Sequence, residues 1–312
     1  MNWIFISIIF ITLLILGGSY YTYRTAFFNP RPKYDDPFRL PKDAQYQKDR
    51  DTMLALIHEV HNLPFEEIII TSFDGLKLYG RYYHTADNAP LQIQMHGYHG
   101  TSFRDFCGGH KIARETGHNI LLIDQRAHGN SEGKTITFGI KERHDCLSWI
   151  QYANKRFGTK TPIILCGVSM GAATVLMASE LDLPENVAGI IADCPYSSPK
   201  EILCKVCKDM HFPVPIVYPL LRLGALIYGH FNVTECSAID AVKNTKIPIL
   251  LIHGEADFFV PTQMSHSIHG SCSSDKMLVT VPAAGHALSY IVDNKLYTTA
   301  SKEFIQKCLE GF

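Results

Sequence analysis

Residues 167–171 read Gly-Val-Ser-Met-Gly, and this pentapeptide is the strongest indication of the fold. It follows an apolar run at 162–166 and leads into small, helix-forming residues at 172–176. A strand, G-x-S-x-G and a helix in this order are typical of a nucleophile elbow, a sharp turn that presents its serine at a strand end. A side chain two residues before or after Ser169 would collide with the crossing strand or helix, so both positions need glycine. The pattern predicts that the Ser169 hydroxyl stands free, just ahead of a helix N-terminus.

Composition bounds the class of protein. The chain has 312 residues, of which 46% are hydrophobic, which fits a single α/β domain of roughly 250 residues with an extension. Lys and Arg number 29 and Asp and Glu 30, for a net charge of −1, so no nucleic-acid partner is predicted. The nine cysteines are irregularly spaced, which is not typical of a disulfide framework and favours buried thiols in a reducing environment.

The N-terminal segment differs from the rest of the chain. Residues 3–23 carry no charge, and the first charged side chain is Arg24. About twenty apolar residues are enough to cross a bilayer as a helix, and tyrosines at 20, 21 and 23 would lie at its interface. We therefore predict a transmembrane anchor at 1–24, with residues 3–23 contacting the membrane. A cleaved signal peptide is the alternative, although the segment lacks a basic start and a small-x-small cleavage site.

Residues 25–62 are predicted to form a linker and an amphipathic helix. Prolines between 29 and 41 predict extended chain, and apolar residues recur at helical spacing between 43 and 62, which predicts a helix that packs on the main domain. Basic side chains follow the apolar segment and none precedes it, which favours the cytoplasmic face for the main domain. They are Arg24, Arg31, Lys33, Arg39, Lys42, Lys48 and Arg50.

Eight β-rich runs with helical segments between them predict an α/β fold. The runs are 66–71, 76–84, 91–95, 119–124, 161–166, 187–192, 247–252 and 276–281. The first two flank a hairpin signal at 72–75, and most of the others are continuously hydrophobic, as central parallel strands are. We predict a mostly parallel sheet with helices on both faces and a ligand site at the carboxyl ends of its strands.

One connection is too long and too apolar for a solvated loop. Some fifty residues separate the strand that ends at Asp193 from the strand that begins at Ile247. They predict a helical cap at about 196–245, inserted after the sixth strand and above the strand ends. The main domain, including this cap, is predicted at 63–312.

A serine nucleophile needs a base, and the base needs an orienting acid. In this architecture the chain order is Ser, acid, His. Asp257 follows the predicted strand at 247–252, and His286 follows the last predicted strand. We predict that Ser169, Asp257 and His286 form a catalytic triad, with Asp193 as the alternative acid. Each of His96, His128 and His253 precedes a glycine in an expected tight turn, and we predict that these histidines stabilise the turns.

The negative charge that develops on the substrate oxygen needs hydrogen-bond donors. One predicted donor is the backbone N–H of Met170, which follows the nucleophile. The second is expected from the loop at 96–100, which reads His-Gly-Tyr-His-Gly. We predict the Tyr98 N–H as this donor, with His99 as the alternative.

Together these motifs resemble the α/β-hydrolase superfamily, specifically its serine hydrolases. The matching stretches are 96–100, 124–131, 167–171, 253–261 and 285–286, and the resemblance covers roughly 65–310. It is strongest to membrane-anchored bacterial hydrolases of the serine aminopeptidase-like and bile-acid acyltransferase-like branches. The resemblance implies an α/β-hydrolase fold with a Ser-His-Asp triad. Residues 124–131 resemble the D-x-R-G-H-G-x-S loop of the family, with Ala127 in place of a glycine, and we interpret them as scaffolding.

The predicted function is hydrolysis of an ester, thioester or small amide through an acyl-enzyme, of carboxylesterase or lipase type or of aminopeptidase type. The apolar cap favours a small-molecule substrate with an apolar acyl group. Acyl transfer by the same triad and a catalytically inactive binding protein are the alternatives. No cofactor or metal is predicted, because Cys204, Cys207 and His211 lack a fourth ligand at finger spacing and no glycine-rich nucleotide-binding motif is present.

Overall fold

The computed structural model describes residues 2–30, 36 and 38–312 of the chain. Its strands are β1 (Glu66–Thr71), β2 (Lys77–Tyr83), β3 (Leu91–Met95), β4 (Asn119–Ile123), β5 (Ile163–Val168), β6 (Val187–Asp193), β7 (Ile249–Gly254) and β8 (Lys276–Val281). Its helices are α1 (Asn2–Ala26), α2 (Ala44–Lys48), α3 (Arg50–His61), α4 (Ser102–Asp105), α5 (Cys107–Glu115), α6 (Glu142–Phe157), α7 (Met170–Ala178), α8 (Pro199–Asp209), α9 (Val214–Ile227), α10 (Ala238–Ala241), α11 (Gln263–Ser271), α12 (Ser289–Val292) and α13 (Asn294–Leu309). Part of the predicted linker at 29–41, including Arg31 and Lys33, lies outside the described residues.

The strands form one mostly parallel sheet in the order β1-β2-β4-β3-β5-β6-β7-β8. Strand β2 runs antiparallel to both of its neighbours, and all other pairs are parallel. All eight predicted β-rich runs are strands, and their ends differ from the prediction by no more than two residues. The antiparallel pair at the start is joined by the predicted turn at 72–75, in which Gly75 has a φ of 91°.

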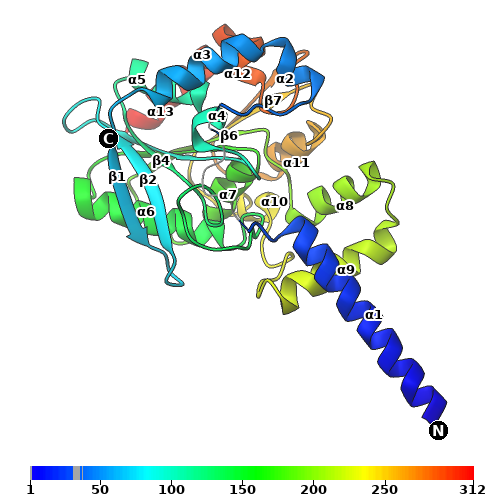
Figure 1. Ribbon diagram of the computed structural model, residues 1–312. Helices are drawn as coiled ribbons and strands as arrows, with labels where there is room; N and C mark the ends of the chain where they lie inside the picture. Colours follow the sequence, from blue (N-terminus) through cyan, green and yellow to red (C-terminus); the bar gives the residue numbers. More distant parts are fainter. Residues whose placement is uncertain (1, 31–35, 37) are drawn as a thin grey trace.

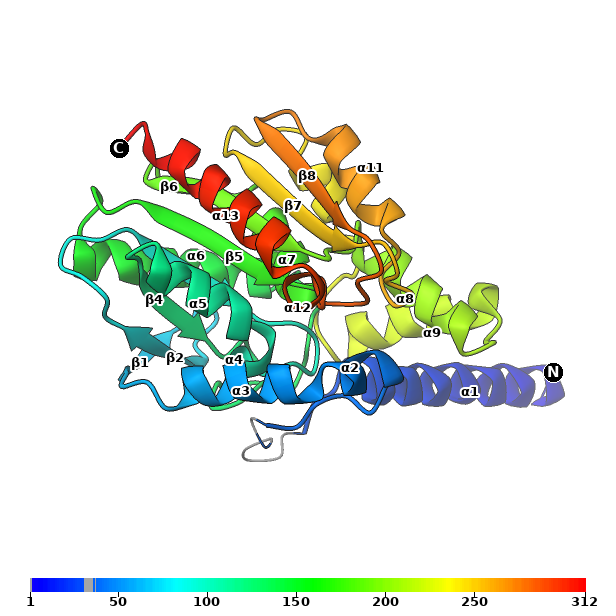
Figure 2. The ribbon, with the colours of Figure 1, turned by 90° about the horizontal axis from the view of Figure 1, so that it is seen from above.

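Helices cover both faces of the sheet, as predicted. Figures 1 and 2 show α3, α5 and α13 on one face and α6 and α7 on the other. Alternate residues of a central strand serve the two layers: in β4, Ile120 and Leu122 pack into the core beneath α5 and α13, and Leu121 and Ile123 into the core beneath α6 and α7. The strand is apolar throughout because it is buried on both faces.

The predicted amphipathic helix at 43–62 is two helices, because the backbone leaves the helical conformation at Asp49 (φ −111°, ψ 22°). In α3, Met53, Ile57 and Val60 are buried, and the helix packs against α5. This arrangement agrees with the predicted apolar spacing. The short α2 bends away to lie over a loop at the carboxyl edge of the sheet.

The last turns of α1 are part of the folded body. Tyr23 and Phe27 are buried, with Phe27 only 1% exposed. The Phe27 carbonyl accepts a hydrogen bond from the Ile136 N–H at 2.8 Å, and the Ala26 carbonyl accepts one from the Tyr98 hydroxyl at 3.0 Å. The end of the apolar helix therefore contributes to the same core as the sheet.

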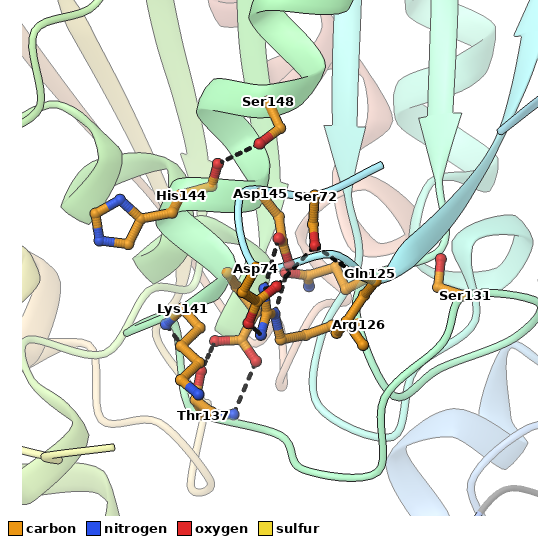
Figure 3. Close-up of polar contacts among 12 residues, drawn as sticks. Ser72, Asp74, Gln125, Arg126, Ser131, Thr137, Lys141, His144, Asp145 and Ser148 are labelled. Atoms are coloured by element: carbon orange, nitrogen blue, oxygen red, sulfur yellow. Dashed lines mark hydrogen bonds and ion pairs between the residues drawn. The ribbon is translucent and has the colours of Figure 1, made fainter. Parts of the chain in front are cut away.

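A buried ionic network explains the 124–131 stretch (Figure 3). Arg126 donates two hydrogen bonds to Asp145 of α6, at 2.6 and 2.7 Å, and two to Asp74 of the β1–β2 turn, at 2.9 and 3.1 Å. Fork-shaped donors on two carboxylates fix their relative positions. The network thus joins the hairpin, the 124–131 loop and α6, in keeping with a scaffolding role. Ala127 has a φ of 61°, a conformation that glycine adopts without strain.

The crossing of β5 and α7 depends on the two glycines of the pentapeptide. Ser169 between them has a φ of 55° and a ψ of −115°, a strained conformation for a residue with a side chain. A Cβ at Gly171 would lie closer to the Met95 carbonyl oxygen than any real Cβ contact allows, and one at Gly167 would meet the Gly171 backbone. The predicted collision is therefore confirmed at both positions.

Substitution of Gly171 tests this constraint. We expect Gly171→Ala to lower the free energy of unfolding by about 3 kcal/mol or more, because overpacking against rigid backbone lies at the upper end of such costs. In Gly270→Ala, the added methyl meets nothing within 4 Å, and a helical alanine is expected to stabilise by up to about 1 kcal/mol. Urea unfolding of both variants in detergent micelles measures the difference. Equal effects of the two substitutions would contradict the packing constraint.

Candidate active site

The structure brings together the three side chains that were predicted to form a triad. His286 Nε2 lies 2.9 Å from Ser169 Oγ, and His286 Nδ1 lies 2.6 Å from Asp257 Oδ2. Ser169 follows β5, Asp257 follows β7 and His286 follows β8, so all three stand at the carboxyl edge of the sheet. Their exposed fractions are 7%, 5% and 9%. A nearly dry site strengthens each of these hydrogen bonds.

Asp257 is held in the ionised form. Burial acts to raise its pKa, but hydrogen bonds from His253 and His286 and from the Val260 N–H outweigh burial and hold the pKa well below its usual range. The Val260 and Phe259 N–H groups both donate to Oδ1, at 2.8 and 2.9 Å. A buried carboxylate fixed in this way can orient an imidazole and stabilise its protonated form.

His253 contributes to this site more than its predicted turn-stabilising role suggested. Its side chain is fully buried, with Nδ1 2.7 Å from the Ser265 hydroxyl and Nε2 2.8 Å from the Val260 carbonyl. The same Nε2 lies 3.3 Å from Asp257 Oδ2. His253 therefore stabilises the turn, and its Nε2 also contacts the carboxylate of Asp257. The sequence signal was its place at the end of β7, four residues before Asp257.

Asp193, the alternative acid, occupies a different environment. Its backbone carbonyl accepts the Ser169 N–H at 2.8 Å, while its side-chain Oδ1 has no partner among the described residues. Burial raises the pKa of Asp193 to about 6, against attraction from His253 and a hydrogen bond from Tyr297. The imidazole of His286 is hydrogen-bonded to Asp257 instead.

The loop at 96–100 passes close to the serine. A Cβ on Gly97 would lie 3.2 Å from Ser169 Cβ. The His99 N–H donates to His128 Nε2 at 3.1 Å, which leaves it no hydrogen for a substrate oxygen. The N–H groups of Tyr98 and Met170 have no acceptor among the described residues. Of the donors considered for this loop, Tyr98 is therefore the one that is free to bind an oxygen.

The N-terminal helices add a contact that the sequence did not predict. The Tyr46 hydroxyl, on α2, donates to the backbone carbonyl of His286 at 2.9 Å, and the Gln45 side chain lies against Gly285. Phe259 packs edge-on against the His286 ring with centroids 5.1 Å apart. The loop that carries the imidazole is thus held from two sides.

One group of potential metal ligands coincides with this site. Within the described parts of the chain, Cys194, Asp257 and His286 offer ligand atoms that all lie within 4.8 Å of one another. Both ring nitrogens of His286 are already engaged with Ser169 and Asp257, and burial raises the pKa of the Cys194 thiol, which disfavours the thiolate that a metal needs. The donor set therefore fits a hydrogen-bonded chain better than a metal centre.

Known proteins resemble this chain in sequence and in fold. A family model described as serine aminopeptidase, S33, matches residues 92–223. The uncharacterized Bacillus subtilis protein YqkD is 26% identical over 61% of this chain and 63% of its own length. The lysophosphatidylserine lipase ABHD12 of Danio rerio is 26% identical over 65% of this chain and 51% of its own length. The chain thus spans less than two thirds of the length of both YqkD and ABHD12.

Solved structures share the architecture. The Pyrococcus furiosus esterase Pf2001 superimposes with a TM-score of 0.63 at 20% identity, over 80% of this chain and 94% of that one. The ferulic acid complex of Est1E from Butyrivibrio proteoclasticus superimposes with a TM-score of 0.61 at 23% identity, over 78% and 99%. The predicted fold class is confirmed.

The pH dependence of stability tests the environment of Asp193. Its folded-state pKa of about 6 lies above the ordinary value, so the folded state resists ionisation and loses stability as the pH rises from about 4 to 7. Removing the charge in Asp193→Asn should stabilise the protein relative to wild type by an amount that grows over this range by about 2–3 kcal/mol. Urea unfolding at pH 4, 5.5 and 7 measures this difference. A constant difference between the two proteins would contradict the assignment.

Proposed function

We propose that this chain, which has the α/β-hydrolase fold and matches the serine aminopeptidase, S33, family model over residues 92–223, is a serine hydrolase that cleaves an ester, thioester or small amide through an acyl-enzyme. The observation that carries the proposal is the hydrogen-bonded chain from Ser169 through His286 to Asp257, with distances of 2.9 and 2.6 Å. These distances lie in the range that a nucleophile and its base require.

The geometry assigns a role to each side chain. As Ser169 Oγ attacks the acyl carbonyl carbon, His286 Nε2 accepts the hydroxyl proton, and the protonated ring is stabilised by the ionised Asp257. The tetrahedral intermediate then collapses, and His286 returns the proton to the leaving oxygen, sulfur or nitrogen. In the second half of the reaction, His286 activates a water molecule that releases the acyl group from Ser169. Acyl transfer would use the same steps with another acceptor in place of water.

The backbone N–H groups of Tyr98 and Met170 are proposed to bind the oxyanion. Both are without an acceptor among the described residues, and Met170 begins α7, whose N-terminus favours negative charge. Each donor of this kind is commonly worth about 10²–10³-fold in rate. The side chain of Tyr98 does not take part, since its hydroxyl bonds to Ala26; that bond instead holds the loop in position.

We propose a substrate with an apolar acyl group. The ring of Tyr98, in the 96–100 loop, packs against Phe138, which in turn packs against Tyr196, so aromatic side chains lie beside this loop. ABHD12, one of the relatives, is named as a lysophosphatidylserine lipase. This likeness favours carboxylic esters over peptides.

The apolar helix α1 is proposed to anchor the enzyme. Residues Trp3–Ala26 are long and apolar enough to cross a membrane, and a yeast relative is named as a membrane protein. Basic residues lie at the end of α1 and after it, which favours the cytoplasmic side for the folded body.

Ester hydrolysis by the full-length protein in detergent micelles tests the proposal. With short p-nitrophenyl esters, Ser169→Ala and His286→Ala should each lower kcat/KM by about 10⁴-fold or more. Ser267→Ala is the matched control, since its hydroxyl bonds only the Gln263 carbonyl of its own helix, and it should retain wild-type activity. Undiminished hydrolysis by folded Ser169→Ala would rule out the proposed nucleophile.

A further inference from the structure

The α8–α9 hairpin is fixed against α1. The Tyr228 hydroxyl, just past the end of α9, donates to the Leu16 carbonyl at 3.1 Å. A Cβ on Gly224 would collide with the backbone of Ser19, so the two helices touch backbone to backbone at this point. The Tyr20 and Tyr228 rings meet edge-on with centroids 5.1 Å apart. Close contact through a glycine is typical of helices that pack within membranes.

These contacts place α9 at a defined depth if α1 crosses a bilayer. A hydrocarbon core of about 30 Å takes about 20 helical residues, so a span that begins at Trp3 extends to about Tyr23. The contacts with α9 lie between Leu16 and Tyr23, which corresponds to roughly the last 10 Å of the span. Helix α9 therefore lies near the end of the hydrocarbon layer that is next to the folded body. Arg24, the first charged residue after the apolar segment, marks this end.

The outward surface of α9 is apolar at this depth, whereas the end of α8 and the connecting turn also expose Lys208, Asp209 and His211. The exposed large hydrophobic residues of the hairpin are Met210, Phe212, Ile216, Leu226 and Ile227. A helix on a water-facing surface normally carries a polar face, whereas the only charge on α9 is Arg222. A single arginine near an interface can extend its guanidinium toward lipid headgroups.

The arrangement of the hairpin agrees with this depth. In both Figure 1 and Figure 2, α8 and α9 project from the body on the side from which α1 leaves, and their connecting turn lies away from the sheet. The first turns of α1, from Trp3 to Leu14, are exposed on all sides. The exposed apolar residues of α9 therefore lie on the same side of the molecule as the candidate membrane span.

We propose that α9 of the hairpin is a second membrane-contacting element, whose outward apolar residues Ile216, Leu226 and Ile227 lie among the acyl chains of the leaflet next to the folded body. The occupant of this face is membrane lipid. The proposal rests on the membrane insertion of α1 and is independent of the catalytic chemistry. Helices α8 and α9 lie within the segment predicted as a cap at about 196–245, so the proposal assigns a membrane contact to part of that segment.

Quenching by brominated lipid tests the proposal in the full-length protein reconstituted into phosphatidylcholine vesicles. In a Trp3→Phe background, the remaining native tryptophan is Trp149, which is fully buried. Ile216→Trp then reports on the hairpin, and Ile69→Trp on β1 is the matched control. The two positions are 63% and 64% exposed, and β1 lies on the opposite side of the molecule from α1 in both views.

We expect the tryptophan introduced at position 216 to lose most of its emission when brominated acyl chains replace ordinary ones, and the one at position 69 to lose little. Equal quenching at the two positions would overturn the proposal. Trp3 in the wild-type protein reports separately on α1: if it is quenched while position 216 is not, the anchor stands and the hairpin proposal fails. If the tryptophan at position 216 is protected from quenching only at high protein concentration, a second copy of the chain covers this face. That result would also overturn the proposal.

Discussion

The crossing of β5 and α7 at Ser169 is the constraint on which the rest of the site depends. Glycine on both sides of the turn lets strand and helix backbones approach until no Cβ would fit, and the serine between them adopts a left-handed φ of 55°. Such strain persists only where the surroundings over-determine it. Here the β6 carbonyl of Asp193 holds the Ser169 N–H, and the 96–100 loop packs against its side chain.

Two carboxyl groups at the same sheet edge are driven in opposite directions by their surroundings. Asp257 receives two backbone N–H groups and two imidazoles, so it stays ionised although it is buried. Asp193 has an unpartnered oxygen, and burial dominates its pKa. The first environment suits an acid that orients a base. In the second, the carboxyl group resists ionisation, and the Asp193 backbone carbonyl does the positioning.

Local patterns were enough to predict the sheet and to place the candidate site residues at strand ends, because strand hydrophobicity and the residues that follow each strand can be read from short stretches of sequence. Contacts between distant segments were not predictable in this way. The bond from Tyr46 to the His286 carbonyl and the packing of Tyr228 on Leu16 join residues more than 200 positions apart. The choice between Tyr98 and His99 likewise needed geometry, because only the fold brings His128 to the His99 N–H. The break at Asp49 follows no local signal that we recognise.

The N-terminal helix α1 joins the α8–α9 hairpin to the candidate site, since the Leu16 carbonyl accepts a hydrogen bond from Tyr228 and the Ala26 carbonyl accepts one from Tyr98. The proposed chemistry requires that Ser169 is an activated nucleophile. Mass spectrometry of the full-length protein after treatment with a fluorophosphonate tests this most directly. We expect a covalent adduct on Ser169 that forms much more slowly in His286→Ala. An intact, folded protein that acquires no adduct, or one modified at another serine, would contradict it.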